Sequence, residues 1–279
     1  MDERVRRLAL LAGERSLQEP EIRHRTPTLS ILIAVVVFLY GAADAVAQPS
    51  QKVVHVFVAL ADNAHQGIVP VPAVLGNGDD PARNLYWGAA FGVRTYFRQD
   101  NEWKEIAVIE NANPFVLERS VFFHAGSDTY LIADAYRGRE IKQAISDFFQ
   151  AAAGLDPDIG EIKTKETGKI VRLTSKPALL VYVGHDGLMD FTLAKSVQGT
   201  DVERRQAIIL ACASKSFFAS GLLPTGAQPL LWTTGLMAPE AYTLKAALDG
   251  WTAGESAQEI RTRAASAYAK YQKCGSTAA

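Results

Sequence analysis

Uninterrupted apolar runs of strand length are the feature that most constrains this chain. "VVHVFVAL", "ALLVYVG" and "AIILACA" are apolar almost throughout, which is typical of strands buried on both faces of a parallel sheet. Segments with helical periodicity alternate with these runs, at residues 84–99, 138–154, 239–249 and 256–272. This alternation predicts an α/β fold, with a three-layer α/β/α sandwich around a mainly parallel central sheet.

Local signals place the remaining elements. Asn84 is expected to cap the helix at 84–99, and Gly154 is expected to end the helix at 138–154. Residues 68–84, rich in proline and glycine, predict a long loop. Residues 156–177 are polar and predict a surface excursion, such as a short hairpin. The runs "VFFHAG" and "TYLIADAY" predict either a pair of strands or a strand and a turn.

The amino terminus has the parts of a secretory signal. Basic residues precede an apolar run at residues 29–40, and a small-x-small end follows at Ala45–Ala47. The run is shorter than the roughly 20 residues of a membrane span. We therefore expect residues 1–47 to be a signal peptide or membrane anchor, and residues 48–279 to form a single domain. The protein is then periplasmic or secreted, and its contact with a membrane is limited to residues 29–40 if they are retained.

Charge and motif content exclude several classes of function. The net charge is −1, with no Lys/Arg-rich stripe, so nucleic acid is not an expected partner. The sequence has no HExxH, CxxC, GxSxG or P-loop motif, and no metal or organic cofactor is expected. Asn77, Asp79 and Asp80 offer oxygen ligands for a cation such as calcium, but a solvated turn is the favoured interpretation.

Two apolar runs end in residue types that carry chemistry. His185 follows one run and Cys212 follows the next along the chain. In open parallel sheets, functional residues collect at the carboxyl ends of the strands, and consecutive strands are often neighbours. A thiol with a pKa of ~8.5 is mostly protonated at neutral pH, and a nearby histidine raises its thiolate content. The alternatives are a histidine that caps a strand end and a cysteine that serves as a small core residue.

The residues around this pair suit the same chemistry. Ala211, Ala213 and Ser214 are small and leave room for a substrate backbone. The backbone N–H groups of Gly187 and Cys212 are expected to face an oxyanion, where each fixed donor is worth about 3 kcal/mol. Asp62, at the end of the first buried run, either contacts this site or caps a turn, and the turn is favoured.

The two motifs together resemble the caspase–legumain–gingipain superfamily of cysteine peptidases. "ILACASKSFFASGLLP" is similar to the segment that holds the legumain nucleophile. The resemblance implies a caspase-like fold with His185 as catalytic histidine, Cys212 as nucleophile and Gly187 as oxyanion donor. It also implies that Thr233 and Thr234, in the block that follows, are residues of a substrate pocket.

The sequence departs from this family at one position. The family has glycine directly after the histidine, whereas Asp186 intervenes in "GHDG". Asp186 either displaces the oxyanion donor or hydrogen-bonds to His185 and orients it.

Three hypotheses follow from the sequence. The first is an exported cysteine peptidase-like protein that cleaves a peptide or protein substrate with a His185–Cys212 dyad. The second is a non-catalytic exported module of the same fold that binds a peptide or an envelope partner. The third is a structural α/β domain in which Cys212 and Cys274 form a disulfide.

Overall fold

The computed structural model describes residues 51–155, 160–173, 176–194, 196–199 and 205–275. The predicted leader at residues 1–47, with its apolar run and its small-x-small end, lies outside the described residues. Within the described part of the chain, no helix combines the length and hydrophobicity that crossing a membrane requires.

A seven-stranded sheet forms the centre of the fold, in the order β2-β3-β4-β1-β7-β8-β9. Within this sheet β4, β1, β7, β8 and β9 run parallel to one another, while β2 and β3 add an antiparallel edge. The predicted mainly parallel sheet is therefore confirmed, and "VFFHAG" and "TYLIADAY" belong to a strand pair, β3 and β4. The strands are β1 (Lys52–Ala59), β2 (Trp103–Glu110), β3 (Val116–His124), β4 (Thr129–Tyr136), β7 (Leu179–Val183), β8 (Gln206–Leu210) and β9 (Gln228–Trp232).

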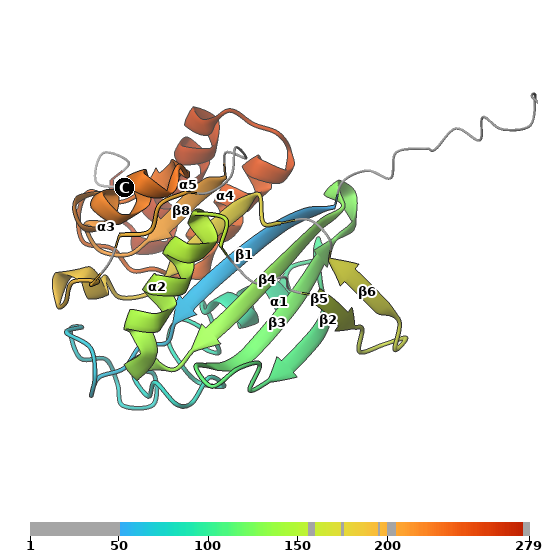
Figure 1. Ribbon diagram of the computed structural model, residues 1–279, viewed down its shortest axis with the longest axis horizontal. Coiled ribbons are helices and arrows are strands. Elements are labelled where there is room, and N and C mark those ends of the chain that lie inside the picture. The colour runs from blue at the N-terminus through green and yellow to red at the C-terminus, as the bar shows by residue number, and fades with distance from the viewer. Residues whose placement is uncertain (1–50, 156–159, 174–175, 195, 200–204, 276–279) are drawn as a thin grey trace, which may run out of the picture. The chain divides into compact units, whose positions relative to one another are not determined.

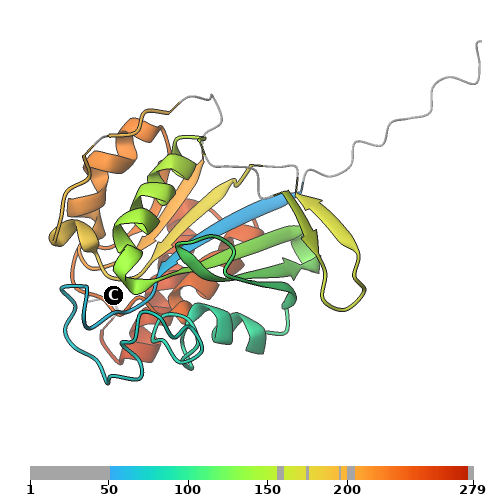
Figure 2. The ribbon, with the colours of Figure 1, turned by 60° about the horizontal axis from the view of Figure 1, so that its bottom comes forward.

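Helices cover both faces of the sheet, which gives the three predicted layers (Figures 1 and 2). One face is covered by α1 (Val93–Gln99), α4 (Ala241–Thr252) and α5 (Ala257–Gln272), whose apolar side chains pack against Val54, Val181 and Ile208. The other face is covered by α2 (Ile141–Ala152) and α3 (Ser214–Leu222). Along each parallel strand, alternate side chains enter the two cores, so the strands are apolar on both faces.

Helix α2 shows why the periodicity in the sequence identifies its buried face. Ile141, Ile145, Phe148 and Phe149 are at most 5% exposed and pack against the sheet. The helix gives way to a turn in which Gly154 adopts a φ of +82°, a backbone conformation that favours glycine.

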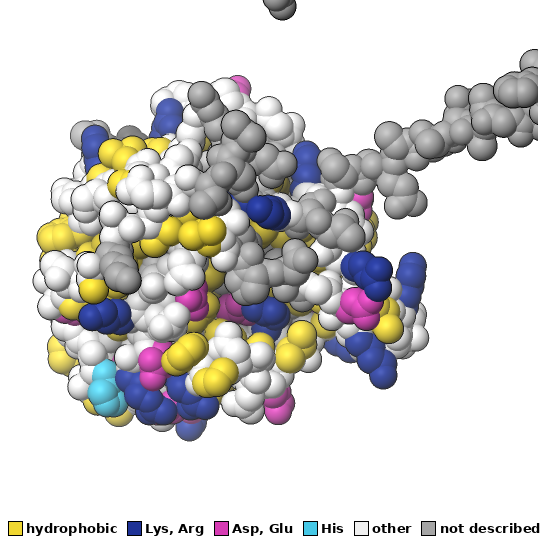
Figure 3. Space-filling model, viewed as in Figure 1, with side chains coloured by type: hydrophobic (Ala, Val, Ile, Leu, Met, Phe, Trp, Pro, Cys, Tyr) yellow, Lys and Arg dark blue, Asp and Glu magenta, His cyan; other side chains and the backbone are white. Residues whose placement is uncertain are grey.

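A short hairpin lies beside the antiparallel edge, as the polar segment predicts. It consists of β5 (Gly160–Lys163) and β6 (Ile170–Leu173), and it packs Ile162 and Leu173 against strand residues such as Ile132. Basic side chains gather over this hairpin (Figure 3). Lys165, which lies between β5 and β6, is 2.8 Å from the carboxylate of Glu105.

The segment 84–92 corrects one prediction, because α1 begins at Val93 and Asn84 does not cap it. Residues 84–92 form a series of turns. The Asn84 side chain is fully buried and hydrogen-bonds to the N–H and the carbonyl of Ala61, at 3.0 and 2.8 Å. Gly92 permits this path, because a Cβ there would lie 2.4 Å from the Trp87 backbone. The apolar spacing predicted a helix, but the segment forms turns that bury Tyr86 and Trp87 and leave Phe91 39% exposed.

Candidate functional site

The register between β7 and β8 brings the two predicted site residues to the same level of the sheet edge. Val183 pairs with Leu210, and the N–H of Gly184 continues the ladder with a 3.2 Å hydrogen bond to the Leu210 carbonyl. His185 and Cys212 each lie two residues beyond this last pair. Neighbouring strands are about 4.8 Å apart. The two residues therefore leave adjacent strands at equivalent positions of the carboxyl edge.

Gly184 allows β7 to end beside β1. Its φ of +151° lies in a region that other residues rarely adopt. A Cβ at this position would lie 2.9 Å from the carbonyl oxygen of Ala59, at the end of β1. A larger residue would displace the turn that carries His185.

The imidazole of His185 is held by a carboxylate that the sequence analysis missed. The Nε2 atom donates to Oδ2 of Asp190 at 2.7 Å, and the His185 side chain is 9% exposed. This contact assigns the proton to Nε2 in the neutral ring, which leaves a lone pair on Nδ1. Tyr182 donates its hydroxyl proton to the His185 carbonyl at 2.8 Å. Asp190 thus fixes the imidazole ring of His185, and Tyr182 fixes the backbone of the same residue.

A distant loop in turn holds Asp190. The N–H of Gly67 donates to Oδ2 of Asp190 at 3.1 Å. A Cβ on Gly67 would lie 2.5 Å from the other carboxylate oxygen, so only glycine allows this approach. The long loop after β1 is therefore connected to the loop after β7.

Asp186 occupies a different place from the one predicted for an orienting residue. It is fully buried, and its Oδ1 accepts from the N–H of Leu188 at 3.0 Å. Its Oδ2 is buried without a hydrogen-bond partner among the described residues. Burial raises the pKa of Asp186 to about 6, and the nearby carboxylate of Asp190 adds to the increase. The ring of His185 is oriented by Asp190, not by Asp186.

Cys212 is half-buried and its thiol contacts the backbone of Met237. The Sγ atom lies 3.5 Å from the Met237 carbonyl oxygen and 3.4 Å from its nitrogen. The next residue, Ala213, has a φ of +46°, which is uncommon for a residue with a Cβ. No hydrogen bond joins this thiol to the His185 ring, although both residues are described. The catalytic pairing of the two side chains therefore stays a prediction.

The predicted oxyanion donors differ in their availability. The N–H of Gly187 donates to the carbonyl of His185 at 3.0 Å, so this donor is already used. The N–H groups of Ala213 and Lys215 are also used, by the carbonyls of Gly235 and Thr233 at 2.8 and 2.9 Å. The N–H of Cys212 makes no hydrogen bond to a described residue, and it remains available.

Thr233 and Thr234 follow β9 and line a hollow of about 250 Å³ that extends to Met237 and Arg261. The Thr233 hydroxyl lies 3.1 Å from both the nitrogen and the hydroxyl oxygen of Ser214, and it donates to the Ala211 carbonyl. Thr233 therefore fastens the turn after Cys212 to β9. The exposed Thr234 has no such bonds in the described part of the structure.

Other sequence candidates have structural roles. Asp62 caps a turn, since its carboxylate accepts from the N–H groups of Ala64 and His65 at 2.9 and 3.2 Å. Asp79 forms ion pairs with Arg137 and Arg139 at 2.9 and 2.7 Å. Among the described residues, no group of three or more His, Cys, Asp or Glu side chains is arranged to hold a metal ion.

The two cysteines are unpaired. Cys212 and Cys274 both carry free thiols, and each is partly buried. A disulfide between them therefore has no support in the structure.

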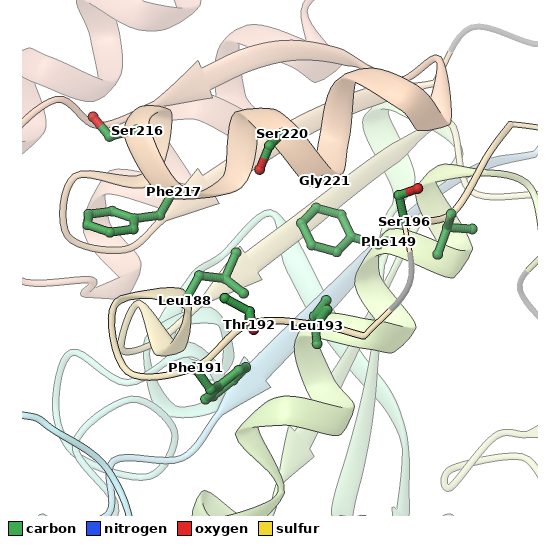
Figure 4. A pocket seen from close by; sticks show the side chains of 11 residues that line it. Phe149, Leu188, Phe191, Thr192, Leu193, Ser196, Ser216, Phe217, Ser220 and Gly221 are labelled. Atoms are coloured by element: carbon green, nitrogen blue, oxygen red, sulfur yellow. The ribbon is translucent and has the colours of Figure 1, made fainter.

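A second hollow, of about 460 Å³, lies between α3 and the loop that follows His185 (Figure 4). Phe217 and Ser220 reach it from α3, and Leu188 and Phe191 from the loop. Phe149 of α2 lies between these two walls (Figure 4). This hollow could not be predicted from the sequence, because its walls come from three separate segments of the chain.

No family model, curated protein or solved structure matches the chain significantly. The structure defines a mixed α/β protein with a seven-stranded, mostly parallel sheet and with His185 and Cys212 at its carboxyl edge.

Proposed function

We propose that the chain is an exported cysteine peptidase of caspase-like architecture, with His185 and Cys212 as the catalytic pair. The observation that carries the proposal is the register of β7 and β8, which sets the two residues at equivalent positions of one sheet edge. The adjacent β1 and β4 are also parallel, which agrees with the mainly parallel sheet expected for that architecture. Export rests on the signal-like residues 1–47.

The geometry of His185 supports the role of general base. Asp190 accepts the Nε2 proton, so Nδ1 can take the proton of the Cys212 thiol as Sγ bonds to the scissile carbonyl carbon. The imidazolium then gives its proton to the leaving amine as the C–N bond breaks. Water next attacks the thioester, which releases the carboxylic acid and restores the thiol. Asp190 stabilises the transient imidazolium throughout.

The thiol needs a rotation for this step. In the structure Sγ lies against the Met237 backbone, and the proposed step requires it to leave this contact and turn towards His185. The unpaired N–H of Cys212 is the proposed oxyanion donor. The N–H of Gly187 would have to break its bond to the His185 carbonyl in order to contribute.

A second candidate function is a non-catalytic exported module that binds a peptide or envelope partner. The observation that favours it is the state of the site: the thiol contacts backbone atoms, and the Gly187 donor is engaged. Such a module keeps its partner when the thiol is removed.

The test is a digestion experiment on the full chain. The protein is incubated with a mixed peptide library, and the products are identified by mass spectrometry. We expect cleavage that Cys212→Ala abolishes and that the matched control Cys274→Ser retains. Both variants are checked for unchanged thermal unfolding. Cleavage that survives in Cys212→Ala would contradict the proposal, and so would a folded wild-type protein that cleaves nothing.

A further inference from the structure

The hollow between α3 and the loop after His185 is lined by aromatic, aliphatic and hydroxyl side chains. Phe217 of α3 and Phe191 of the loop lie on opposite sides of it, Leu188 lies between these two residues, and the Phe149 ring lies beside Gly221 (Figure 4). Its described lining residues include hydroxyl groups such as that of Ser220, but no charged side chain. An uncharged apolar group gains free energy when it leaves water for this hollow. An unpaired charge would instead lose the free energy of its hydration.

The ring of Phe149 forms a fixed part of the wall of this hollow. Phe149 belongs to α2, is 3% exposed and packs in the core on this side of the sheet. Gly221 on α3 allows the ring to lie against the helix, because a Cβ there would lie 2.5 Å from a ring carbon of Phe149. The volume of about 460 Å³ is in the range of small-molecule sites and is large enough for an aromatic side chain.

The hollow lies within reach of the proposed catalytic pair. Leu188 is three residues past His185 in the chain. Because a residue spans at most about 3.6 Å, this wall begins within roughly 11 Å of that histidine. An extended polypeptide would cover this distance with about three residues, counted from the scissile bond in one direction.

We infer that this hollow is a specificity subsite for an aromatic or branched aliphatic side chain of the polypeptide substrate, a few residues from the bond that is cleaved. The inference rests on the proposed peptidase function. It names the substrate class: sequences with an uncharged apolar residue at one fixed position near the scissile bond.

Filling the hollow tests the inference. Ser220→Trp places a large ring at its rim, and the matched control Leu223→Trp adds the same ring at an exposed position that does not line it. In the peptide library, wild type is expected to select Phe, Leu or Ile at one position. Ser220→Trp is expected to lower kcat/KM for those peptides at least about ten-fold, and Leu223→Trp by less than about two-fold.

A binding measurement separates failure of the inference from failure of the proposed function. Saturation-transfer NMR with N-acetyl-phenylalaninamide on Cys212→Ala should detect binding that is lost when Ser220→Trp is added, and N-acetyl-glutamate amide should not bind. Cleavage with selectivity unchanged by Ser220→Trp would overturn the subsite and leave the peptidase intact. Probe binding without any cleavage would overturn both and identify a pocket for free apolar ligands instead. Absence of both signals would also overturn both.

Discussion

Replacing Asp186 with asparagine is expected to stabilise the protein at neutral pH but not at acidic pH. Burial raises the pKa of this carboxyl to about 6 from its ordinary 3.8. The folded state therefore holds the proton more tightly than the unfolded state does. The associated stabilisation is complete below pH 3.8 and is lost as the pH rises through about 6.

The magnitude follows from the difference between the two pKa values. Each pKa unit corresponds to about 1.4 kcal/mol, so ionised Asp186 costs roughly 3 kcal/mol of folding free energy at high pH. Asparagine avoids this cost because it does not ionise. Its amide oxygen can still accept from the N–H of Leu188. Its amide nitrogen replaces Oδ2, which has no hydrogen-bond partner among the described residues.

Urea unfolding at acidic, neutral and alkaline pH measures this effect. Asp186→Asn should match wild type near pH 4 and exceed its free energy of unfolding by about 2–3 kcal/mol near pH 8. Asp79→Asn is the matched control, since it removes an exposed carboxylate paired with Arg137 and should not stabilise. A difference that is the same at all pH values would refute the reasoning, as would a loss of stability near pH 8.

Two further predictions concern positions where the backbone depends on one side chain. Asn84→Ala should lower the free energy of unfolding by about 2–4 kcal/mol, because it leaves the N–H and carbonyl of Ala61 without their buried partner. Urea unfolding measures this change, and a loss below about 1 kcal/mol would contradict it. Gly67→Ala should push the Asp190 carboxylate off His185, since the added Cβ would lie 2.5 Å from a carboxylate oxygen. A ¹⁵N spectrum of the imidazole should show the loss of the Nε2–H signal that the carboxylate protects, and an unchanged spectrum would refute this prediction.

The parts of the fold that could be predicted from sequence are those whose pattern is local. The apolar runs of β7 and β8 have one explanation, burial on both faces, and the spacing of Ile141, Ile145 and Phe148 allows one buried helical face. The segment 84–92 could not be predicted this way. Its apolar spacing fits a helix, and only the contact of Asn84 with Ala61, across 23 residues, selects turns instead.

Part of the candidate site could likewise be predicted from the sequence, and part of it could not. The strand ends at His185 and Cys212 are visible as motifs, because each follows an apolar run. The residue that holds the imidazole is Asp190, which in turn depends on Gly67, 123 residues earlier in the chain. A carboxylate five residues after the histidine was a signal that sequence reasoning could have used. The engaged N–H of Gly187 depends on a turn geometry that the motif does not specify.

The rate at which iodoacetamide alkylates Cys212 tests the pairing of imidazole and thiol most directly. The measurement uses a Cys274→Ser background, so that Cys212 is the thiol that reacts. The alkylation rate of the protein with His185 is compared with that of the His185→Ala variant near pH 6.5. Because the thiolate is the reactive species, the pairing predicts that the substitution slows alkylation at least about ten-fold. Equal rates with and without the imidazole would contradict the account.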